Sequence, residues 1–237
     1  MIELLNKEDK TINSEMALIK FLNTLLPEDI LILIGDIKEL KQFKDYKILK
    51  TYGLAIGLMF SRKNTVYIVG NHDIKMLGQS IYNATIQPSY VAIVQPFYIR
   101  DNILFMHGHQ FDWLNNKHHW IVDWALQALR WIEEQINPHI DVDLDRLLRY
   151  GRVSDSDEKY IKLSTEEAVK TGVNTVVLGH THRKKIVSRS GIYYCNSGCW
   201  VNGNRDVLHI RTDNNNIYCI SDLHLGDKGK ADDFWTI

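Results

Sequence analysis

Five short apolar segments of this sequence are each followed directly by side chains that can bind a metal ion. In two of these clusters the ligand types are spaced two residues apart, as Asp222-x-His224 and His180-x-His182. In an extended segment this spacing turns both side chains to the same side. The other three clusters are Gly35-Asp36, Gly70-Asn71-His72-Asp73 and His107-Gly108-His109. The pattern therefore predicts metal chemistry.

The candidate ligands combine carboxylates, imidazoles and one amide carbonyl. They are Asp36, Asn71, His107, His180, His182, Asp222 and His224. Mixed nitrogen and oxygen ligation suits manganese, iron, zinc or cobalt. Calcium prefers oxygen ligands alone, and structural zinc sites normally use cysteines. Because the candidates exceed what one tetrahedral ion needs, we expect two divalent ions that share a bridging carboxylate, with manganese first and iron, zinc, cobalt or magnesium as alternatives.

Alternating helices and strands would bring these clusters together in an α/β fold. Buried strands are expected over Ile30–Ile34, Val66–Val69, Ile103–Met106 and Thr175–Leu178. In α/β sheets, ligands collect beyond the carboxyl ends of the strands, where these clusters fall. Helices are expected over Ser14–Leu26, over Asp45–Phe60, and from the capping box Ser164-Thr-Glu-Glu167 to about Lys170. Two hairpins are expected, over residues 184–195 and 207–220.

Taken together, these motifs resemble those of the calcineurin-like metallophosphoesterase superfamily. The motifs are Asp-x-His, Gly-Asp-x-x-Glu ending at Glu39, Gly-Asn-His-Asp, His-Gly-His and Gly-His-x-His. The resemblance extends from Gly35 to His182 and again from Ile217 to Phe234. It implies a four-layer αββα sandwich and a phosphoesterase that depends on two divalent metal ions.

The resemblance also implies a role for each residue that matches a motif. One ion would be held by Asp36, His182, Asp222 and His224, and the second by Asp36 as the bridge, Asn71, His107 and His180. His72 would be a catalytic residue that donates a hydrogen bond to a phosphoryl or leaving oxygen, and Glu39 would orient it. A hydroxide bridging ions about 3.5–4 Å apart would attack a phosphodiester, pyrophosphate or phosphomonoester bond in line.

The order of the motifs differs from the usual order in the family. Asp-x-His normally lies on the first strand, but here it lies near the C-terminus, within Ile217–Gly226. The simplest account is a circular permutation, in which the usual last strand (Val207–Arg211) joins the usual first strand through Thr212–Asn216. Permutation is tolerated where termini are neighbours and loops are exposed. It predicts that Met1 and Ile237 lie close together in space.

About 70 residues separate His107 from Gly179. Residues 112–165 are expected to form a helical cap inserted into a single domain over residues 1–237. The segment Trp113–Ile136 has helical periodicity and an apolar face. Three roles are open for this face: it packs against the domain, it forms an aromatic wall for a base or acyl chain, or it forms a dimer interface. The architecture is similar to that of the UDP-2,3-diacylglucosamine pyrophosphatase branch, which typically has Arg in place of His72 and Asp in place of His109.

The composition excludes several classes of protein. The chain has 237 residues, of which 45% are hydrophobic and 24% charged, and this excludes a disordered or collagen-like chain. The formal net charge is −1, so bulk charge would not hold duplex nucleic acid, and a small phosphorylated substrate is expected. Three cysteines predict no disulfide framework. A polar N-terminal segment and the lack of an apolar run of about 18 residues predict a cytoplasmic protein with no membrane segment.

Two other functions stay open. A nuclease of the same fold is the first, although the sequence has no evident basic run to bind duplexes. A non-catalytic metal-binding scaffold is the second, since some relatives with this fold act as scaffolds; these usually lack a histidine at the position of His72. A homodimer is also open.

Several neighbouring residues have weaker functional signals. Asp73 is expected to cap the turn that follows it. His109 could touch the substrate or be a plain polar neighbour, and Arg183 could meet a phosphate or lie at the surface. Cys195 and Cys199 are expected to be small buried residues.

Overall fold

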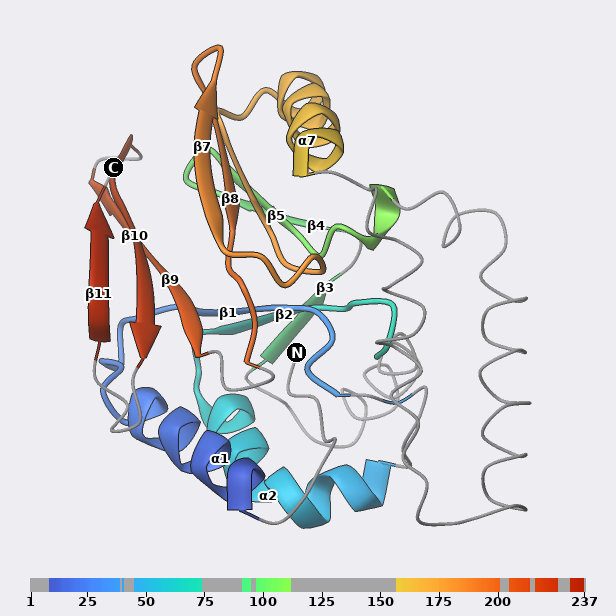
Figure 1. Cartoon of the computed structure of the whole chain (residues 1–237), viewed down its shortest axis with the longest axis vertical. Coiled ribbons are helices and arrows are strands. Elements are labelled where there is room, and N and C mark those ends of the chain that lie inside the picture. Colours follow the sequence, from blue (N-terminus) through green and yellow to red (C-terminus); the bar gives the residue numbers. More distant parts are fainter. Residues whose placement is uncertain are drawn as a thin grey trace, which may run out of the picture.

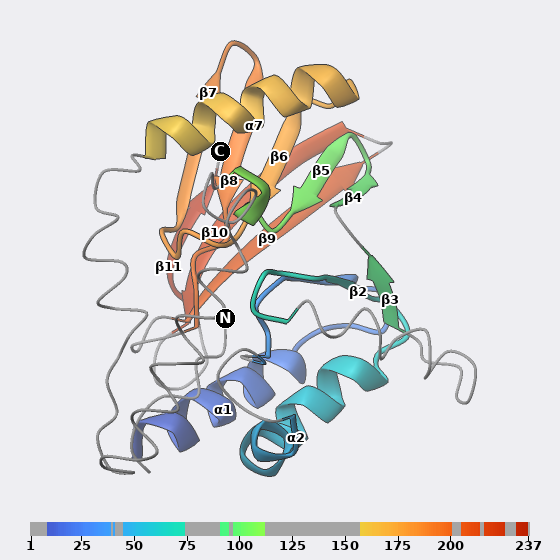
Figure 2. The same ribbon diagram turned by 90° about the vertical axis from the view of Figure 1, so that its right-hand side faces the viewer.

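The structure is a computed structural model in which helices lie outside stacked β-sheets (Figure 1, Figure 2). It describes residues 9–38, 40, 45–73, 91–94, 97–111, 157–200, 205–213, 216–225 and 231–236. No helix within these stretches has the length and apolar character that a membrane crossing requires.

The layers succeed one another as helix, sheet, sheet and helix, which confirms the predicted α/β class. Helices α1 (Asp9–Leu22) and α2 (Asp45–Ser61) cover a parallel sheet of strands β1 (Leu31–Ile34), β2 (Thr65–Ile68) and β3 (Val91–Val94), in that order. Helix α7 (Asp157–Thr171) covers a second, five-stranded sheet with the order β4-β5-β6-β8-β7. Its strands are β4 (Phe97–Arg100), β5 (Ile103–Met106), β6 (Thr175–Leu178), β7 (Lys185–Arg189) and β8 (Ile192–Asn196), and the short 3-10 helix η1 (His109–Phe111) follows β5.

A third sheet contains the C-terminal strands. Strands β9 (Asp206–Asp213), β10 (Asn216–Leu225) and β11 (Ala231–Thr236) pair antiparallel in the order β11-β10-β9. Leu208 and Ile210 of β9 pack against the core between the first two sheets. The predicted hairpin over residues 207–220 is therefore confirmed, and it lies at the side of the sandwich (Figure 1).

Within the described residues, alternating side chains on the strands build three separate apolar cores. On β2, Tyr67 packs against α1 and α2, whereas Val66 and Ile68 face the second sheet. On β5, Leu104 packs beneath α7, whereas Phe105 faces the first sheet. This period of two is expected for strands that are covered on both faces. Burial of each such side chain contributes roughly 1.5–3 kcal/mol to folding.

The predicted buried strands are all found within one residue of their expected bounds, but two of the predicted helices begin earlier than expected. Helix α1 covers Asp9–Leu22 instead of the expected Ser14–Leu26. Helix α7 begins at Asp157 and passes through the supposed capping box. The Ser164 hydroxyl donates to the carbonyl oxygen of Tyr160 inside the helix instead of capping an N-terminus. The earlier start buries Tyr160 and Ile161 against the second sheet, and this packing overrides the local capping signal.

Two of the sequence predictions about the fold fall outside the described residues. They concern the cap helix over Trp113–Ile136, with most of the insertion around it, and the proximity of Met1 to Ile237. Both stay predictions.

Candidate metal centre

Three of the predicted metal ligands meet where β1, β5 and β6 end. Asp36, His107 and His180 each offer a ligand atom within 4.8 Å of the others. The Oδ2 atom of Asp36 lies 3.0 Å from Nε2 of His107, which lies 3.2 Å from Nδ1 of His180. Asp36 and His107 are buried and His180 is half-buried. One carboxylate and two imidazoles at this spacing can hold a divalent ion.

The strand ends explain why residues so distant in the chain converge. Strands β5 and β6 are parallel neighbours, so their carboxyl ends coincide, and the Gly179 N–H donates to the His107 carbonyl oxygen over 3.1 Å. Strand β1 belongs to the other sheet, and its Ile34 carbonyl oxygen lies 2.8 Å from Nδ1 of His107. A carbonyl oxygen only accepts, so Nδ1 carries a proton and Nε2 is the nitrogen directed to the metal position.

Three candidate ligands have a left-handed backbone, which non-glycine residues rarely adopt. The φ angles are 53° for Asp36, 63° for His180 and 58° for His182. Such conformations cost about 1–3 kcal/mol each and cluster at functional sites, where the surrounding contacts maintain them. Positive φ angles also occur at the turn residues Asp101, Asn102 and Ser190, so the backbone conformation alone does not identify these loops as functional.

Two glycines allow the loops to approach one another. A Cβ atom on Gly35 would lie 2.6 Å from Cγ of His107, and a Cβ atom on Gly70 would lie 2.6 Å from the Asp36 backbone nitrogen. Both contacts are far shorter than real Cβ contacts. The two positions therefore require glycine, because the backbone itself forms the wall of the cluster.

Opposite charges keep the central carboxylate ionised. Burial by itself would raise the pKa of Asp36, but attraction to His107 and His72 and the hydrogen bond from His107 hold that pKa well below its usual range. Burial would lower the pKa of His107, and the Asp36 charge raises it instead. The carboxylate is thus charged, as a metal ligand must be.

Asn71 provides a separate test of whether these residues fit a metal ion. Its Oδ1 atom is buried, and no hydrogen-bond donor among the described residues reaches it. A buried polar atom without a partner costs about 1–3 kcal/mol and calls for a physical explanation. An amide oxygen is an ordinary ligand for divalent ions, so a cation at this position would remove the cost. The donor set therefore fits a metal.

A second buried carboxylate, Asp73, joins the loop after β2 to the loop after β1. It accepts hydrogen bonds from the backbone N–H groups of Gly70 (2.6 Å) and Ile37 (2.8 Å) and from the Tyr67 hydroxyl. Burial and the nearby Asp36 charge raise the pKa of Asp73. Asp73 thus positions two loops that carry candidate ligands. Sequence reasoning missed Tyr67, which reads as one more apolar strand residue.

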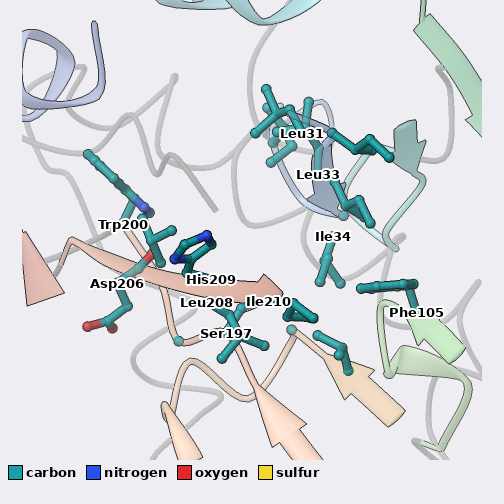
Figure 3. A pocket seen from close by; sticks show the side chains of 18 of the residues that line it. Leu31, Leu33, Ile34, Phe105, Ser197, Trp200, Asp206, Leu208, His209 and Ile210 are labelled. Carbon is teal, nitrogen blue, oxygen red and sulfur yellow. Dashed lines mark hydrogen bonds between the residues drawn. The ribbon is translucent and has the colours of Figure 1, made fainter. Parts of the chain in front are cut away.

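A cavity of about 600 Å³ adjoins the cluster and is bordered by Asp36, His107, His180 and His182. Figure 3 shows Leu33 and Ile34 of β1 on one side, with Leu208 and Ile210 of β9 on another. The remaining labelled residues are Leu31, Phe105, Ser197, Trp200, Asp206 and His209. The volume lies within the range of about 300–1,000 Å³ that is usual for small-molecule sites.

The strand that carries the Asp-x-His pair lies beside this cavity. In the register of β10 with β9, Asp222 is opposite Leu208 and His224 is opposite Asp206. Leu208 and Asp206 both line the cavity. The backbone of the pair is therefore one strand away from the cavity wall, and its side chains lie outside the described part of the structure.

The remaining sequence candidates have varied outcomes. Glu39 lies outside the described residues. Arg183 is exposed, with a guanidinium nitrogen 3.5 Å from a carboxylate oxygen of Asp157, so it is a surface residue. The His109 ring centroid lies 5.4 Å from that of His107. Cys195 and Cys199 are buried free thiols, which confirms the prediction for both.

The sequence around this cluster identifies the protein family. A model of the calcineurin-like phosphoesterases matches residues 14–184. The chain belongs to the calcineurin-like phosphoesterase family. The matched region contains Asp36, Asn71, His107 and both histidines of the Gly-His-x-His motif, and it ends before Asp222.

The solved structures to which this chain is similar are distant in sequence. Vps29 from Entamoeba histolytica is 14% identical with a TM-score of 0.45, over 92% of this chain and 88% of that one. A predicted phosphoesterase from Streptococcus pneumoniae is 11% identical with a TM-score of 0.38, over 97% and 92%. GAP50 of Plasmodium is 11% identical with a TM-score of 0.47, over 98% and 85%. No curated protein matches the sequence.

Replacing Gly70 by alanine should weaken metal binding without removing a ligand, because the added Cβ atom would displace Asp36. We expect the affinity for Mn²⁺, measured by calorimetry, to fall about 10–100-fold, as when a metal ligand loses its support. Gly57→Ala is the matched control, since an added Cβ on this exposed residue of α2 has no atom within 4 Å. It should leave the affinity unchanged and raise the free energy of unfolding by roughly 0.5–1 kcal/mol. Wild-type affinity in Gly70→Ala would contradict the proposed role of this close approach.

Proposed function

We propose that this protein hydrolyses a phosphodiester, pyrophosphate or phosphomonoester bond with the help of two divalent metal ions. The observation that carries the proposal is the convergence of Asp36, His107 and His180 on one buried point from three strand ends. Membership of the calcineurin-like phosphoesterase family supports it. The buried Asn71 oxygen without a hydrogen-bond partner among the described residues supports it independently.

The proposed ligand sets follow from the motifs. Asp36 would be a ligand of both ions, with Asn71, His107 and His180 holding one and His182, Asp222 and His224 holding the other. Manganese is the proposed metal. When bound, the two ions supply a nucleophile from water at neutral pH and stabilise charge on the phosphoryl oxygens. The protein's own contribution is to hold the ligands in place before the substrate arrives, which requires no reorganisation during the reaction.

His72 is the proposed hydrogen-bond donor to the reacting phosphate. Its backbone N–H donates to Oδ1 of Asp36 over 2.9 Å, which ties its position to the bridging carboxylate. Its ring lies close enough to lower the pKa of Asp36. A donor fixed beside the metal ligands can stabilise charge that develops on a phosphoryl or leaving oxygen. Glu39 is the proposed residue that orients this ring.

A small phosphorylated molecule is the proposed substrate. The cavity beside the cluster has the volume of a small-molecule site, and the net charge of −1 offers no general attraction to a nucleic-acid duplex. A nuclease and a non-catalytic scaffold are the alternatives that an assay must separate. The free buried Cys195 and Cys199 are in keeping with the proposed cytoplasmic location.

We also propose that the chain is a circular permutation of the family's usual order. The antiparallel pairing of β9 with β10 supports this, because it joins the usual last strand to the usual first strand by a short connection. The permutation would explain why the family match ends at residue 184 although Asp222 and His224 follow later in the chain.

Substitutions at Asp36 and His72 should separate metal binding from turnover. Asp36→Asn should abolish both, because the proposed bridge contacts both ions. His72→Ala should retain the metal and lose about 10²–10⁴-fold in rate, the usual contribution of a positioned donor. The measurements are the metal content per chain and the Mn²⁺-dependent hydrolysis of p-nitrophenyl phosphate and bis-p-nitrophenyl phosphate.

The outcomes of this experiment distinguish the functions. Hydrolysis of only one of the two esters by the wild type would identify a monoesterase or a diesterase. A metal-loaded wild type that hydrolyses neither ester would favour the scaffold. Equal loss of metal in the two variants would show that the assigned roles are wrong.

Restoring the usual motif order tests the permutation. In the rearranged chain, a flexible linker joins Ile237 to Met1, and the new ends lie in the β9–β10 connection at residues 214–215. We expect wild-type metal content and turnover, because a permutation changes connectivity and leaves the site intact. A control that opens the chain inside β6, between Val176 and Val177, should fail to fold. An inactive rearranged chain with native circular dichroism would count against the permutation.

A further inference from the structure

We propose that Asn196 is a positioning residue of the metal centre, whose side chain fixes the segment that carries His180 and His182. The inference rests on the proposed function, because it assumes that these histidines bind metal. Asn196 is the last residue of β8, and the pairing of β8 with β6 places it opposite Leu178, directly before this segment.

The Asn196 amide is completely buried and its hydrogen bonds point into two loops. Its Nδ2 group donates to the Gly179 carbonyl oxygen over 2.7 Å and to the Thr181 hydroxyl over 3.1 Å. Its Oδ1 atom accepts from the Gly198 N–H over 3.0 Å. Both ends of the amide are therefore used within the protein, and Asn196 serves as a clamp instead of a metal ligand.

The clamped segment has a strained backbone. His180 and His182 both have positive φ angles, and Thr181 lies between them. The Gly179 carbonyl oxygen also accepts from the Thr181 N–H over 2.7 Å, so it receives two hydrogen bonds that close a tight turn. Without the Asn196 donor, the segment can relax toward negative φ angles and carry both imidazoles away from their positions.

The other side of the clamp is itself fixed by Asp206. Its Oδ2 atom accepts from the Cys199 N–H over 3.2 Å, and its carbonyl oxygen accepts from the Trp200 indole N–H over 2.8 Å. A Cβ atom on Gly198 would lie 2.6 Å from Cβ of Asp206, so only glycine fits there. Figure 3 shows Trp200 and Asp206 close together at one end of the cavity. Asn196 therefore connects the loop at Gly198–Trp200, which Asp206 holds in place, to the strained segment His180–His182.

Aspartate at position 196 tests the clamp at nearly constant volume. Asn196→Asp replaces the donating NH₂ by an oxygen that repels the Gly179 carbonyl oxygen. We expect the affinity for Mn²⁺ alone, measured by calorimetry, to fall about 10–100-fold, the usual effect of removing a group that orients a metal ligand. The Co²⁺ absorption spectrum, which reports coordination geometry, should also shift.

Asn64→Asp is the matched control. The Asn64 Nδ2 group likewise donates to a backbone carbonyl oxygen, that of Pro27, over 3.1 Å, but it is exposed and does not contact the candidate ligands. The Asn64→Asp variant should leave the Mn²⁺ affinity unchanged.

Thr181→Val is a milder second variant that should still fold. It should lower the affinity about fivefold, which corresponds to one hydrogen bond of about 1 kcal/mol.

The failure of this inference differs from failure of the proposed function. If the wild type binds no Mn²⁺, the proposed function is wrong. If the wild type binds Mn²⁺ and folded Asn196→Asp and Thr181→Val bind it equally well, Asn196 has no positioning role. The same conclusion follows if Asn64→Asp loses as much affinity as Asn196→Asp.

Discussion

The candidate metal centre is arranged around one buried negative charge. The Asp36 carboxylate is almost completely removed from water, and such a charge is tolerated only when opposite charges and hydrogen-bond donors surround it. The His107 imidazole lies 3.0 Å from one carboxylate oxygen of Asp36, and the backbone N–H of His72 donates to the other over 2.9 Å. Glycines at positions 35 and 70 let the backbone close around this point. A site with this concentration of strain and charge is shaped for a ligand, and a divalent cation is the ligand that its donors fit.

The sandwich makes this arrangement possible because it brings the strand ends of two sheets to one place. Asp36 comes from the sheet that α1 and α2 cover, whereas His107 and His180 come from the sheet that α7 covers. The contact between His107 and the Ile34 carbonyl oxygen joins the two sheets directly at the site. Around the ligands, Asp73 and Asn196 join neighbouring loops by buried hydrogen bonds. The rigid layers of the fold therefore fix the positions of the candidate ligands.

The strand ends are predictable from the sequence for a physical reason. A buried strand such as Thr175–Leu178 is a short apolar run, and the residues that follow it must lie at the edge of the sheet. The sequence alone is therefore enough to group Asp36, His107 and His180. Longer-range partners carry no such signal. The contacts of Tyr67 with Asp73, and of Asn196 with the Gly179–Thr181 turn, depend on how separate loops are stacked. At helix α7 a sequence signal is present but misleading. The local capping pattern at Ser164 predicts a helix start, and the burial of Tyr160 and Ile161 extends the helix past it.

Anomalous scattering from crystals grown with Mn²⁺ would locate any metal ions at this cluster. We expect two peaks about 3.5–4 Å apart. One should be within bonding distance of Asp36, Asn71, His107 and His180, and the other should share Asp36 with His182, Asp222 and His224. Crystals in which manganese is absent from Asp36, with the carboxylate still paired to His107 alone, would contradict the proposed metal centre.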